Sequence, residues 1–304
     1  MLIVLVQMMA IIVLGVAWHH FRPGGSDNNA IRGALTSVVY YLFLPALVLI
    51  VLWKAPLGIN SINISIIAAA TVFLSLCLSW FLTRLLKLDK PMAGAILLAS
   101  SFPNATYLGL PVLETVLGPW AQRIAIQYDL FACTPILLTL GVLLAERYGG
   151  KTEHANPLRS LLKVPPLWAA VVAVVLNLMQ VPVPTWLDGL LNRMAVVVTP
   201  LMLLALGISL EWRRSHWRLI PKLIPVSIIQ LVIAPLFAWF LISTIGIHGA
   251  PGTAIVLEAA MPSMLLGIVL CDRYGLNTNA YAGAVTLTTL LSMASLPVWL
   301  LVLQ

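Results

Sequence analysis

The sequence predicts an all-α membrane protein with ten transmembrane helices, arranged as two inverted five-helix repeats. Three observations lead to this fold class: the composition, the succession of apolar runs, and the alternation of charge between them. Of the 304 residues, 61% are hydrophobic and 9% are charged, and the mean hydropathy is +1.02. A soluble domain carries about 25% charged residues, and its surface needs more polar cover than this chain can supply. A lipid bilayer is therefore the solvent that fits the chain.

Apolar runs long enough to cross a bilayer, which takes about 20 residues, recur along the whole chain. The expected spans are 2–20, 34–53, 63–86, 92–117, 121–145, 165–181, 188–210, 222–245, 252–271 and 279–303. The first run has no Lys or Arg before it and no small-residue cleavage site after it, which favours a retained helix over a signal peptide. The three cysteines, Cys77, Cys133 and Cys271, lie inside these runs without a CxxC motif. Neither a disulfide framework, a metal site nor a cofactor is expected.

Positive charge alternates between the connections of these spans. Arg and Lys residues follow the odd-numbered spans, and only Lys54, Arg123 and Arg193 of the 17 lie on the opposite side. The positive-inside rule then places the odd-numbered connections in the cytoplasm and both termini on the extracytoplasmic side of the cell (inner) membrane. The net charge of +7 is spread along the connections, so it indicates contact with a lipid bilayer and no nucleic-acid partner.

The two halves of the chain resemble each other weakly. Span two reads "LFLPALVLIVLW" around Pro45 and span seven reads "VVTPLMLLALGI" around Pro200, while Pro103 of span four pairs with Pro262 of span nine at nearly the same offset. We therefore expect a first repeat over 1–148, a cytoplasmic linker over 149–164, and a second repeat over 165–304. Because five spans is an odd number, the second repeat must be inverted, as in many secondary transporters. Chance is the alternative, since proline is common in membrane helices.

Spans four and nine are expected to be broken at their prolines. Pro103 lies in the middle of "SSFPNATYLGLPV", where it cannot donate to the carbonyl four residues earlier. We expect half-helices over about 92–102 and 106–117, with Asn104 and Ser101 satisfying the freed backbone groups. Span nine should break in the same way at Pro262 and Ser263. The alternative is a pair of kinked packing helices without a site.

The two breaks predict an anion site. Unwound backbone at this depth is tolerated only inside protein or beside a watery cavity, so the breaks are expected to cross near the bilayer midplane. Each second half-helix would direct its unpaired N–H groups and partial positive charge into the crossing, where a carboxylate is the natural ligand. The expected substrate-binding residues are Pro103, Asn104, Ala105, Thr106, Tyr107, Pro262, Ser263 and Met264.

Asp129 and Glu258 are the acidic residues that we place well inside spans. An isolated charge there costs at least about 2.5 kcal/mol, so each is expected to be protonated or paired, and either could carry a coupling proton or cation. The alternative is a hydrogen bond that joins helices, worth about 0.6 kcal/mol. Other polar residues within spans, among them Gln127, Tyr128, Asn177 and Gln230, are interpreted mostly as helix–helix contacts.

The motifs "FPNATYLGLPV" and "AAMPSMLLGIVLCDRYG" resemble the auxin efflux carrier family, and the likeness extends over essentially the whole chain. The resemblance implies a scaffold of spans one, two, six and seven, often dimeric, and a moving transport domain of spans three to five and eight to ten. It implies that Asn104 is the crossover asparagine, that Pro103 and Pro262 are the crossover prolines, and that Tyr128 and Asp129 form a pair found in prokaryotic members. The plant run Asn-Pro-Asn-Thr-Tyr is altered here to Phe-Pro-Asn-Ala-Thr-Tyr, and the loop at 146–164 is short, which favours a prokaryotic, malate-permease-like member.

The predicted function is secondary transport of small organic anions by alternating access, coupled to protons or to the membrane potential. A sodium-coupled symporter of the bile-acid type is the nearest alternative, because carbonyls at broken helices suit Na⁺ as well. A membrane enzyme is disfavoured, since neither HExxH, GxGD nor an aspartate-rich motif occurs. A sensor or channel is disfavoured as well, because the chain shows no long soluble domain and no ring-forming charge pattern.

Overall fold

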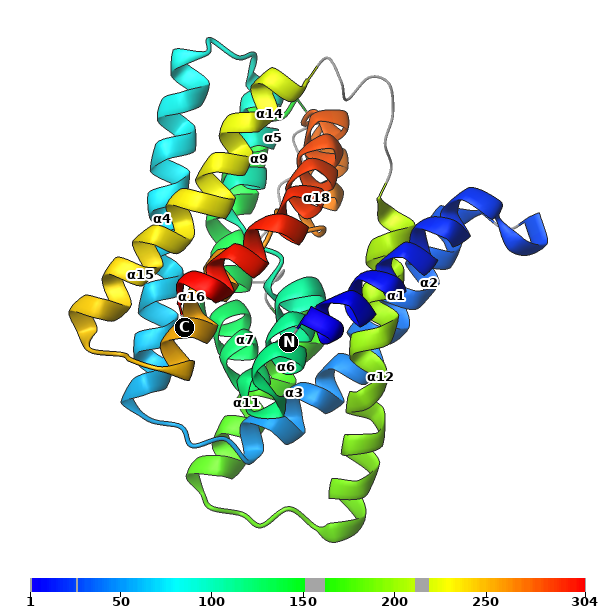
Figure 1. Ribbon diagram of the computed structural model, residues 1–304, viewed down its shortest axis with the longest axis vertical. Coiled ribbons are helices and arrows are strands. Elements are labelled where there is room, and N and C mark those ends of the chain that lie inside the picture. The colour runs from blue at the N-terminus through cyan, green and yellow to red at the C-terminus, as the bar shows by residue number, and fades with distance from the viewer. Residues whose placement is uncertain (1, 26, 151–161, 211–218, 304) are drawn as a thin grey trace. The chain divides into compact units, whose positions relative to one another are not determined.

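The computed structural model describes residues 2–25, 27–150, 162–210 and 219–303. All regular elements within these ranges are helices, apart from a single two-residue antiparallel bridge (Figure 1). This confirms the predicted all-α class for the described part of the chain. Most of the predicted linker 149–164, and the basic residues Arg213, Arg214 and Arg218, lie outside the described residues.

Among the described residues, six helical segments are long and apolar enough to cross a membrane. They are Ala30–Trp53, Ser61–Leu85, Pro119–Tyr148, Thr185–Ser209, Ile220–Ile245 and Thr278–Val302. They coincide with the predicted spans two, three, five, seven, eight and ten. Predicted spans one and six appear as shorter apolar helices, and spans four and nine appear as pairs of short helices. The count of ten spans and their inverted repeat remain predictions.

Contacts divide the chain into two compact units. Unit 1 comprises Met1–Ile62, Thr106–Ile126 and Leu161–Leu210, and unit 2 comprises Asn63–Ala105, Gln127–Ser160 and Glu211–Gln304. The helices of unit 1 are α1 (Leu2–Phe21), α2 (Asn28–Val38), α3 (Leu44–Trp53), α6 (Leu110–Leu117), α11 (Pro165–Leu178) and α12 (Thr185–Ser209). Within this unit α12 packs on α1, α2 and α3, and α11 packs on α3.

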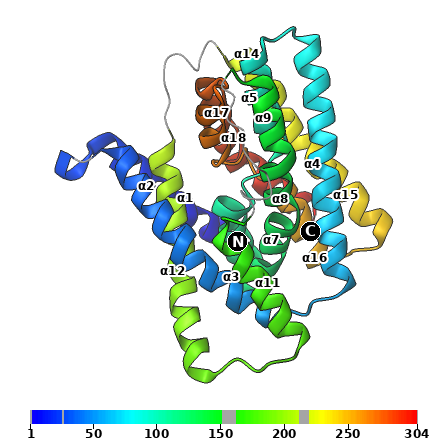
Figure 2. The ribbon, with the colours of Figure 1, turned by 180° about the vertical axis from the view of Figure 1, so that it is seen from behind.

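Two glycines bring α1 and α12 into close contact. A Cβ on Gly15 would lie 2.8 Å from the Cα of Gly207, and a Cβ on Gly207 would lie 2.8 Å from the Cα of Gly15. Small residues of this kind let two membrane helices approach backbone to backbone. Nearby, a ring nitrogen of His19 lies 2.8 Å from the carbonyl oxygen of Ile208, which joins the ends of the two helices. Figures 1 and 2 show α1 beside α12 from both sides.

Unit 2 holds most of α4 and the helices on which the site is built. These are α4 (Ile59–Leu85), α5 (Lys90–Ser101), α8 (Thr134–Ile136), α9 (Val142–Tyr148), α14 (Ile220–Ile228), α15 (Ala234–Ile245), α16 (Ala250–Ala259), α17 (Gly267–Tyr274) and α18 (Thr278–Val302). The buried helix α5 packs on α9, α14, α17 and α18. The division between the units falls within α4, within η3 (Ala105–Gly109) and within α7 (Gln122–Tyr128).

Several helices take up a proline without breaking. A π-helical turn precedes Pro45, Pro135 and Pro235, at η2 (Val39–Phe43), η5 (Asp129–Cys133) and η7 (Ile229–Ile233). In each turn the residue before the proline donates its N–H to the carbonyl five residues earlier, for example Thr134 to Asp129. The wider turn gives the proline ring room and keeps the backbone bonded, because the extra residue relaxes the clash with the preceding turn. Pro200 lies inside the continuous helix α12.

Candidate functional site

The first half of the site is the end of α5. This helix begins after Asp89, whose carboxylate accepts a hydrogen bond from the Met92 N–H at 3.4 Å, and it ends at Ser101. Phe102 is extended, with φ −113° and ψ 108°, a conformation that a following proline favours because it disfavours the helical region for the residue before it. The chain becomes helical again at Ala105. The predicted break at Pro103, with half-helices over about 92–102 and 106–117, is confirmed.

The second half of the site is the break between α16 and α17. Helix α16 ends at Ala259, and Pro262 and Ser263 lie in the non-helical link that precedes α17 at Gly267. The amide of Met261 still bonds to the carbonyl of Glu258 at 3.2 Å. The predicted break at Pro262 and Ser263 is therefore also confirmed.

The two links lie side by side in unit 2 and are joined by their backbones. The Asn104 N–H donates to the Pro262 carbonyl at 2.7 Å, and the Met264 N–H donates to the Phe102 carbonyl at 2.9 Å. Together they form an antiparallel bridge between Pro103 and Ser263. The backbone groups that the two prolines expose are thus bonded across the two breaks rather than to solvent, which fixes the two links to each other.

The Ser263 hydroxyl satisfies the carbonyl that Pro103 leaves free. That carbonyl belongs to Ala99, four residues before the proline, and it accepts from Ser263 Oγ at 2.6 Å. The expectation that Asn104 and Ser101 would satisfy the freed groups was wrong. Ser101 Oγ lies 3.5 Å from Ser79 Oγ, and the side chain of Asn104 has no hydrogen-bond partner among the described residues. The sequence placed the break correctly, but the satisfying residue comes from the other broken helix.

Three polar residues on neighbouring helices hold the second link in place. Gln230 Nε2 donates to the Met261 carbonyl at 3.0 Å, Tyr281 Oη donates to the Met264 carbonyl at 2.7 Å, and Thr288 Oγ1 accepts from the Ser263 N–H at 3.1 Å. Gln230 was interpreted as a helix–helix contact, and its bond joins η7 to the link after α16. Tyr281 and Thr288 were not among the predicted residues. Their only signal was polar character inside an apolar span.

Asn104 is the polar group at the crossing that lacks partners. Its side chain is fully buried, and neither Oδ1 nor Nδ2 makes a hydrogen bond within the described chain. An amide can accept twice and donate twice, and a buried unsatisfied polar group costs about 1–3 kcal/mol. Its backbone N–H is used on Pro262, so the side chain remains the part of Asn104 that can bind something else.

A second group of buried polar side chains lies in the same unit. Tyr128, Asp129, Cys133 and Glu258 are close enough for their charges to act on one another. Asp129 accepts from Thr134 Oγ1 at 2.8 Å. Glu258 is fully buried, and neither of its carboxylate oxygens has a partner within the described residues. Tyr128 is also fully buried, and its interpretation as a helix–helix contact remains a prediction.

The remaining predicted site residues fall in different places. Ala105 and Met264 are buried beside the bridge, with the Met264 N–H and carbonyl both hydrogen-bonded. Thr106 and Tyr107 are half-buried in the π-helical turn that opens the second half of span four, and they group with unit 1. The hydrogen of Ser263 Oγ is bonded to Ala99, which leaves that oxygen only as an acceptor.

Glu114 is a further acidic residue that was not predicted to have a role. This residue lies in α6 of unit 1, half-buried, and its Oε2 accepts from Thr199 Oγ1 of α12 at 2.6 Å. It was passed over because it is close to the predicted end of span four. Its partner, 85 residues away in the chain, could not be paired with it by spacing. Among the described residues no group of His, Cys, Asp and Glu is arranged to hold a metal ion.

These features define the class of protein. Long apolar helices and two interrupted helices bonded through their breaks, with unpaired polar groups in the interior, are the architecture of a multi-pass membrane transporter. The chain belongs to the membrane transport protein family, which includes the auxin efflux carriers and whose model matches residues 1–300. The resemblance drawn from the two proline motifs is thereby confirmed.

Three prokaryotic relatives carry the same description. The chain is 29% identical, over 97% of both chains, to an uncharacterized transporter of Methanothermobacter thermautotrophicus. It is 26% identical to an uncharacterized transporter of Methanocaldococcus jannaschii over 87% of each chain, and 22% identical to one of Escherichia coli K12 over 74% of this chain and 73% of the relative. Each is described as a transporter, with no substrate given.

Proposed function

We propose that this protein is a secondary transporter of small organic anions, in particular carboxylates, that works by alternating access. The observation that carries the proposal is the crossing of the two breaks, where the fully buried side chain of Asn104 has no partner in the described part of the chain. An amide held in this way stays unsatisfied until a ligand supplies acceptors and donors, which makes ligand binding favourable there.

A negative ligand fits this crossing better than a positive one. Each break is followed by a helical segment, which begins at Ala105 after the first break and at Gly267 after the second. A helix N-terminus carries partial positive charge. The amide of Asn104 can donate two hydrogen bonds to a carboxylate. In the proposal Pro103, Ala105, Pro262 and Met264 shape the binding site through their backbones, Thr106 and Tyr107 line it, and Ser263 positions the two links.

The proposed movement is of one group of helices against another. Predicted spans one, two, six and seven would form a scaffold, dimeric with a second copy, and spans three to five and eight to ten would form the transport domain. Support comes from the grouping of contacts, since unit 1 holds the first set and unit 2 most of the second. The second half of span four groups with unit 1, which differs from that assignment. Both termini are proposed to lie outside the cell membrane, because of the distribution of Lys and Arg.

Coupling is proposed to depend on Glu258 and Asp129. A buried carboxylate without a partner is costly, so Glu258 is best accommodated when it carries a proton or contacts a cation. In proton coupling, Glu258 carries the proton. In sodium coupling, as in the bile-acid type of symporter, Glu258 contacts Na⁺, because carboxylate oxygens are the ligands that hard cations prefer. The two free oxygens of Glu258 are the observation that keeps the sodium alternative open.

A ligand screen on purified protein tests the proposed substrate class. Melting temperatures are measured against a panel of mono- and dicarboxylates, with amines and neutral sugars of similar size beside them. We expect stabilisation by one or more carboxylates in the wild type and none in Asn104→Ala. Asn192→Ala, which removes an exposed asparagine of α12, is the matched control and should respond as the wild type does. Unchanged carboxylate binding and uptake in Asn104→Ala would rule out the site.

Transport in proteoliposomes with imposed gradients tests the coupling. Uptake of the carboxylate identified by the screen is measured with a pH gradient, a Na⁺ gradient or a membrane potential, each applied separately. For a proton-coupled carrier we expect the pH gradient to drive accumulation in the wild type, and Glu258→Gln to lose this accumulation while still exchanging substrate across the membrane. Accumulation driven by Na⁺ alone would support the alternative. Full gradient-driven accumulation in Glu258→Gln would contradict a coupling role.

A further inference from the structure

A second polar site lies in unit 2, at the opposite end of α5 from Pro103. It is a pocket of about 310 Å³ formed by the end of α4, the start of α5 and the end of α9. Three of its lining residues are cations, one from each element: Arg84, Lys90 and Arg147. The described lining residues include no Asp or Glu; the others are Thr83, Leu88, Ala93 and Tyr148.

The wall of the pocket is built by close packing. Gly94 of α5 faces the pocket's Tyr148 so closely that a Cβ on it would lie 2.7 Å from the Cβ of Tyr148. Tyr148 is therefore held against α5 next to Ala93, and Arg147 precedes it on the last turn of α9. Thr83, which is buried, donates to the carbonyl of Trp80 at 2.8 Å. Thr83 and Tyr148 are thus held in place by their neighbours, while Arg84, Lys90 and Arg147 are exposed. The pocket is therefore open to a ligand of the opposite charge.

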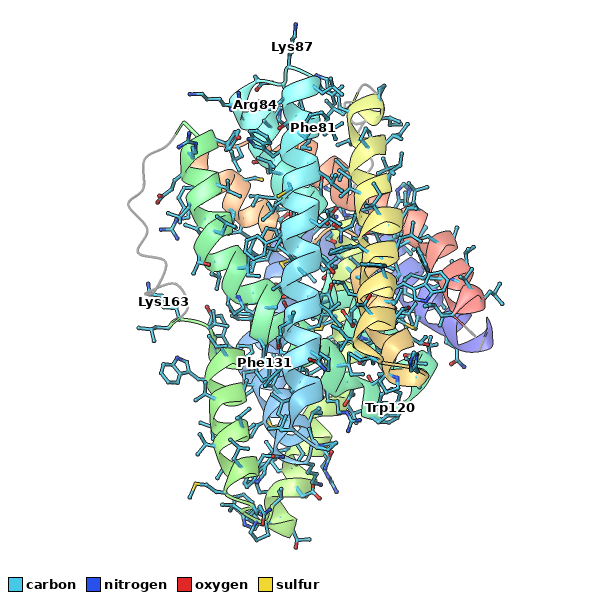
Figure 3. The ribbon with its side chains drawn as sticks, turned by 90° about the vertical axis from the view of Figure 1, so that its left-hand side faces the viewer. Phe81, Arg84, Lys87, Trp120, Phe131 and Lys163 are labelled. Carbon is cyan, nitrogen blue, oxygen red and sulfur yellow. The ribbon has the colours of Figure 1, made fainter. Side chains whose placement is uncertain are left out.

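The environment places this pocket at the level of lipid head groups. Trp80, one turn before Arg84 on α4, is exposed, and the Arg84 guanidinium lies 5.3 Å from the centre of its ring. Phe81 and Leu85 of the same helix end are 63% and 67% exposed. Figure 3 shows Phe81, Arg84 and Lys87 together at this end of α4. Apolar side chains beside tryptophan and arginine mark the boundary between hydrocarbon and water, and the charge pattern assigns this boundary to the cytoplasmic side.

We propose that the pocket of Arg84, Lys90 and Arg147 binds a phosphate group, carried by an anionic phospholipid of the cytoplasmic leaflet. Two guanidinium groups can each hold phosphate oxygens in a bidentate way, and a lysine adds a third charge. Basic pockets between membrane helices on the cytoplasmic side have the chemistry that lipid head groups require. The acyl chains would lie along the exposed apolar residues of α4. The site is distinct from the crossing at Asn104 and does not depend on the proposed substrate.

Lipid retention measured by native mass spectrometry tests this inference. Protein purified from vesicles of phosphatidylcholine and phosphatidylglycerol is compared as wild type, Lys90→Gln, Arg147→Gln and the control Lys87→Gln. Lys87 is an exposed cation of the same connection outside the pocket lining. We expect wild type and Lys87→Gln to retain phosphatidylglycerol, and each pocket variant to bind it about tenfold more weakly, since one charge-assisted hydrogen bond is lost.

Two further arms separate the sources of the phosphate. Melting temperatures are measured with inorganic phosphate alone and with short-chain phosphatidylglycerol alone. Stabilisation by the lipid that is lost in Arg147→Gln supports the proposal. Stabilisation by inorganic phosphate without any effect of the lipid would overturn the lipid assignment. An equal loss of lipid in Lys87→Gln and Arg147→Gln would overturn the pocket itself, because binding would then follow total charge.

Discussion

Among the described residues, the polar side chains between helices of unit 1 have partners, whereas several of those in unit 2 have none. Asn177 of unit 1 donates to the carbonyls of Leu52, Trp53 and Ala55 at 3.1, 2.7 and 2.7 Å, and Glu114 accepts from Thr199. In unit 1 only Asn28 Oδ1 is a buried atom without a partner in the described chain. In unit 2 such atoms lie on Asn104, Gln127, Gln230, Glu258, Thr289 and Ser295.

The difference teaches which polar residues serve the fold and which serve a ligand. A satisfied polar group between membrane helices stabilises their packing modestly. A buried polar group without a partner lowers stability, and proteins retain such groups chiefly at functional sites. This contrast supports the proposal that unit 1 serves as the scaffold and that unit 2 binds and releases the substrate. The contrast can be tested by removing matched residues from each unit.

The largest expected effect comes from the two asparagines. Asn177→Leu leaves carbonyls at the end of α3 without their donor, and we expect it to lower the free energy of unfolding by about 2–3 kcal/mol. Asn104→Leu removes a side-chain amide that makes no hydrogen bond to any described residue. The free energy of unfolding should therefore change by less than about 1 kcal/mol, or rise. Both are measured by denaturant unfolding of detergent-solubilised protein. A loss at Asn104 as large as that at Asn177 would abolish the contrast.

The next largest effect compares a hydrogen bond between the two breaks with a hydrogen bond inside an ordinary helix. Ser263→Ala removes the donor to the Ala99 carbonyl, a group that Pro103 cannot serve, and we expect a loss of about 1–2 kcal/mol together with slower uptake. Ser227→Ala is the matched control, because its buried hydroxyl donates at 3.3 Å to the Leu223 carbonyl within its own helix. That variant should stay within about 0.5 kcal/mol of the wild type. Equal losses in the two variants would mean that the bond from Ser263 has no special role.

The breaks themselves could be predicted from the sequence, but their internal bonding could not. Pro103 and Pro262 lie among polar residues in the middle of apolar runs, and both end their helices as expected. Pro135 lies in an equally apolar run, yet a π-helical turn absorbs it. Local sequence predicts that a proline disturbs a helix. Whether the helix then breaks or forms a wider π-helical turn depends on which groups pack against it. At Pro103 the approaching group is Ser263, far away in the chain.

The residues of the candidate site also differ in whether the local sequence can identify them. Asn104 and Glu258 were named as candidates from the sequence because a polar residue next to a break, or a carboxyl inside a span, is costly without a purpose. The bonds from Gln230, Tyr281 and Thr288 could not be predicted, because nothing local links these residues to Met261, Ser263 and Met264. Their roles depend on tertiary contacts between helices, which one sequence does not reveal.

The smallest expected effect concerns Glu114 of unit 1. Thr199→Val removes the hydroxyl that donates to Glu114 at 2.6 Å, and we expect unfolding to become easier by about 0.6–1 kcal/mol with uptake unchanged. Thr199→Ser keeps the donor and should match the wild type in both measurements. If Thr199→Val instead kept its stability and lost uptake, Glu114 would belong to the transport machinery. The division between a supporting and a binding unit would then fail at α6, which belongs to unit 1 although it is part of span four.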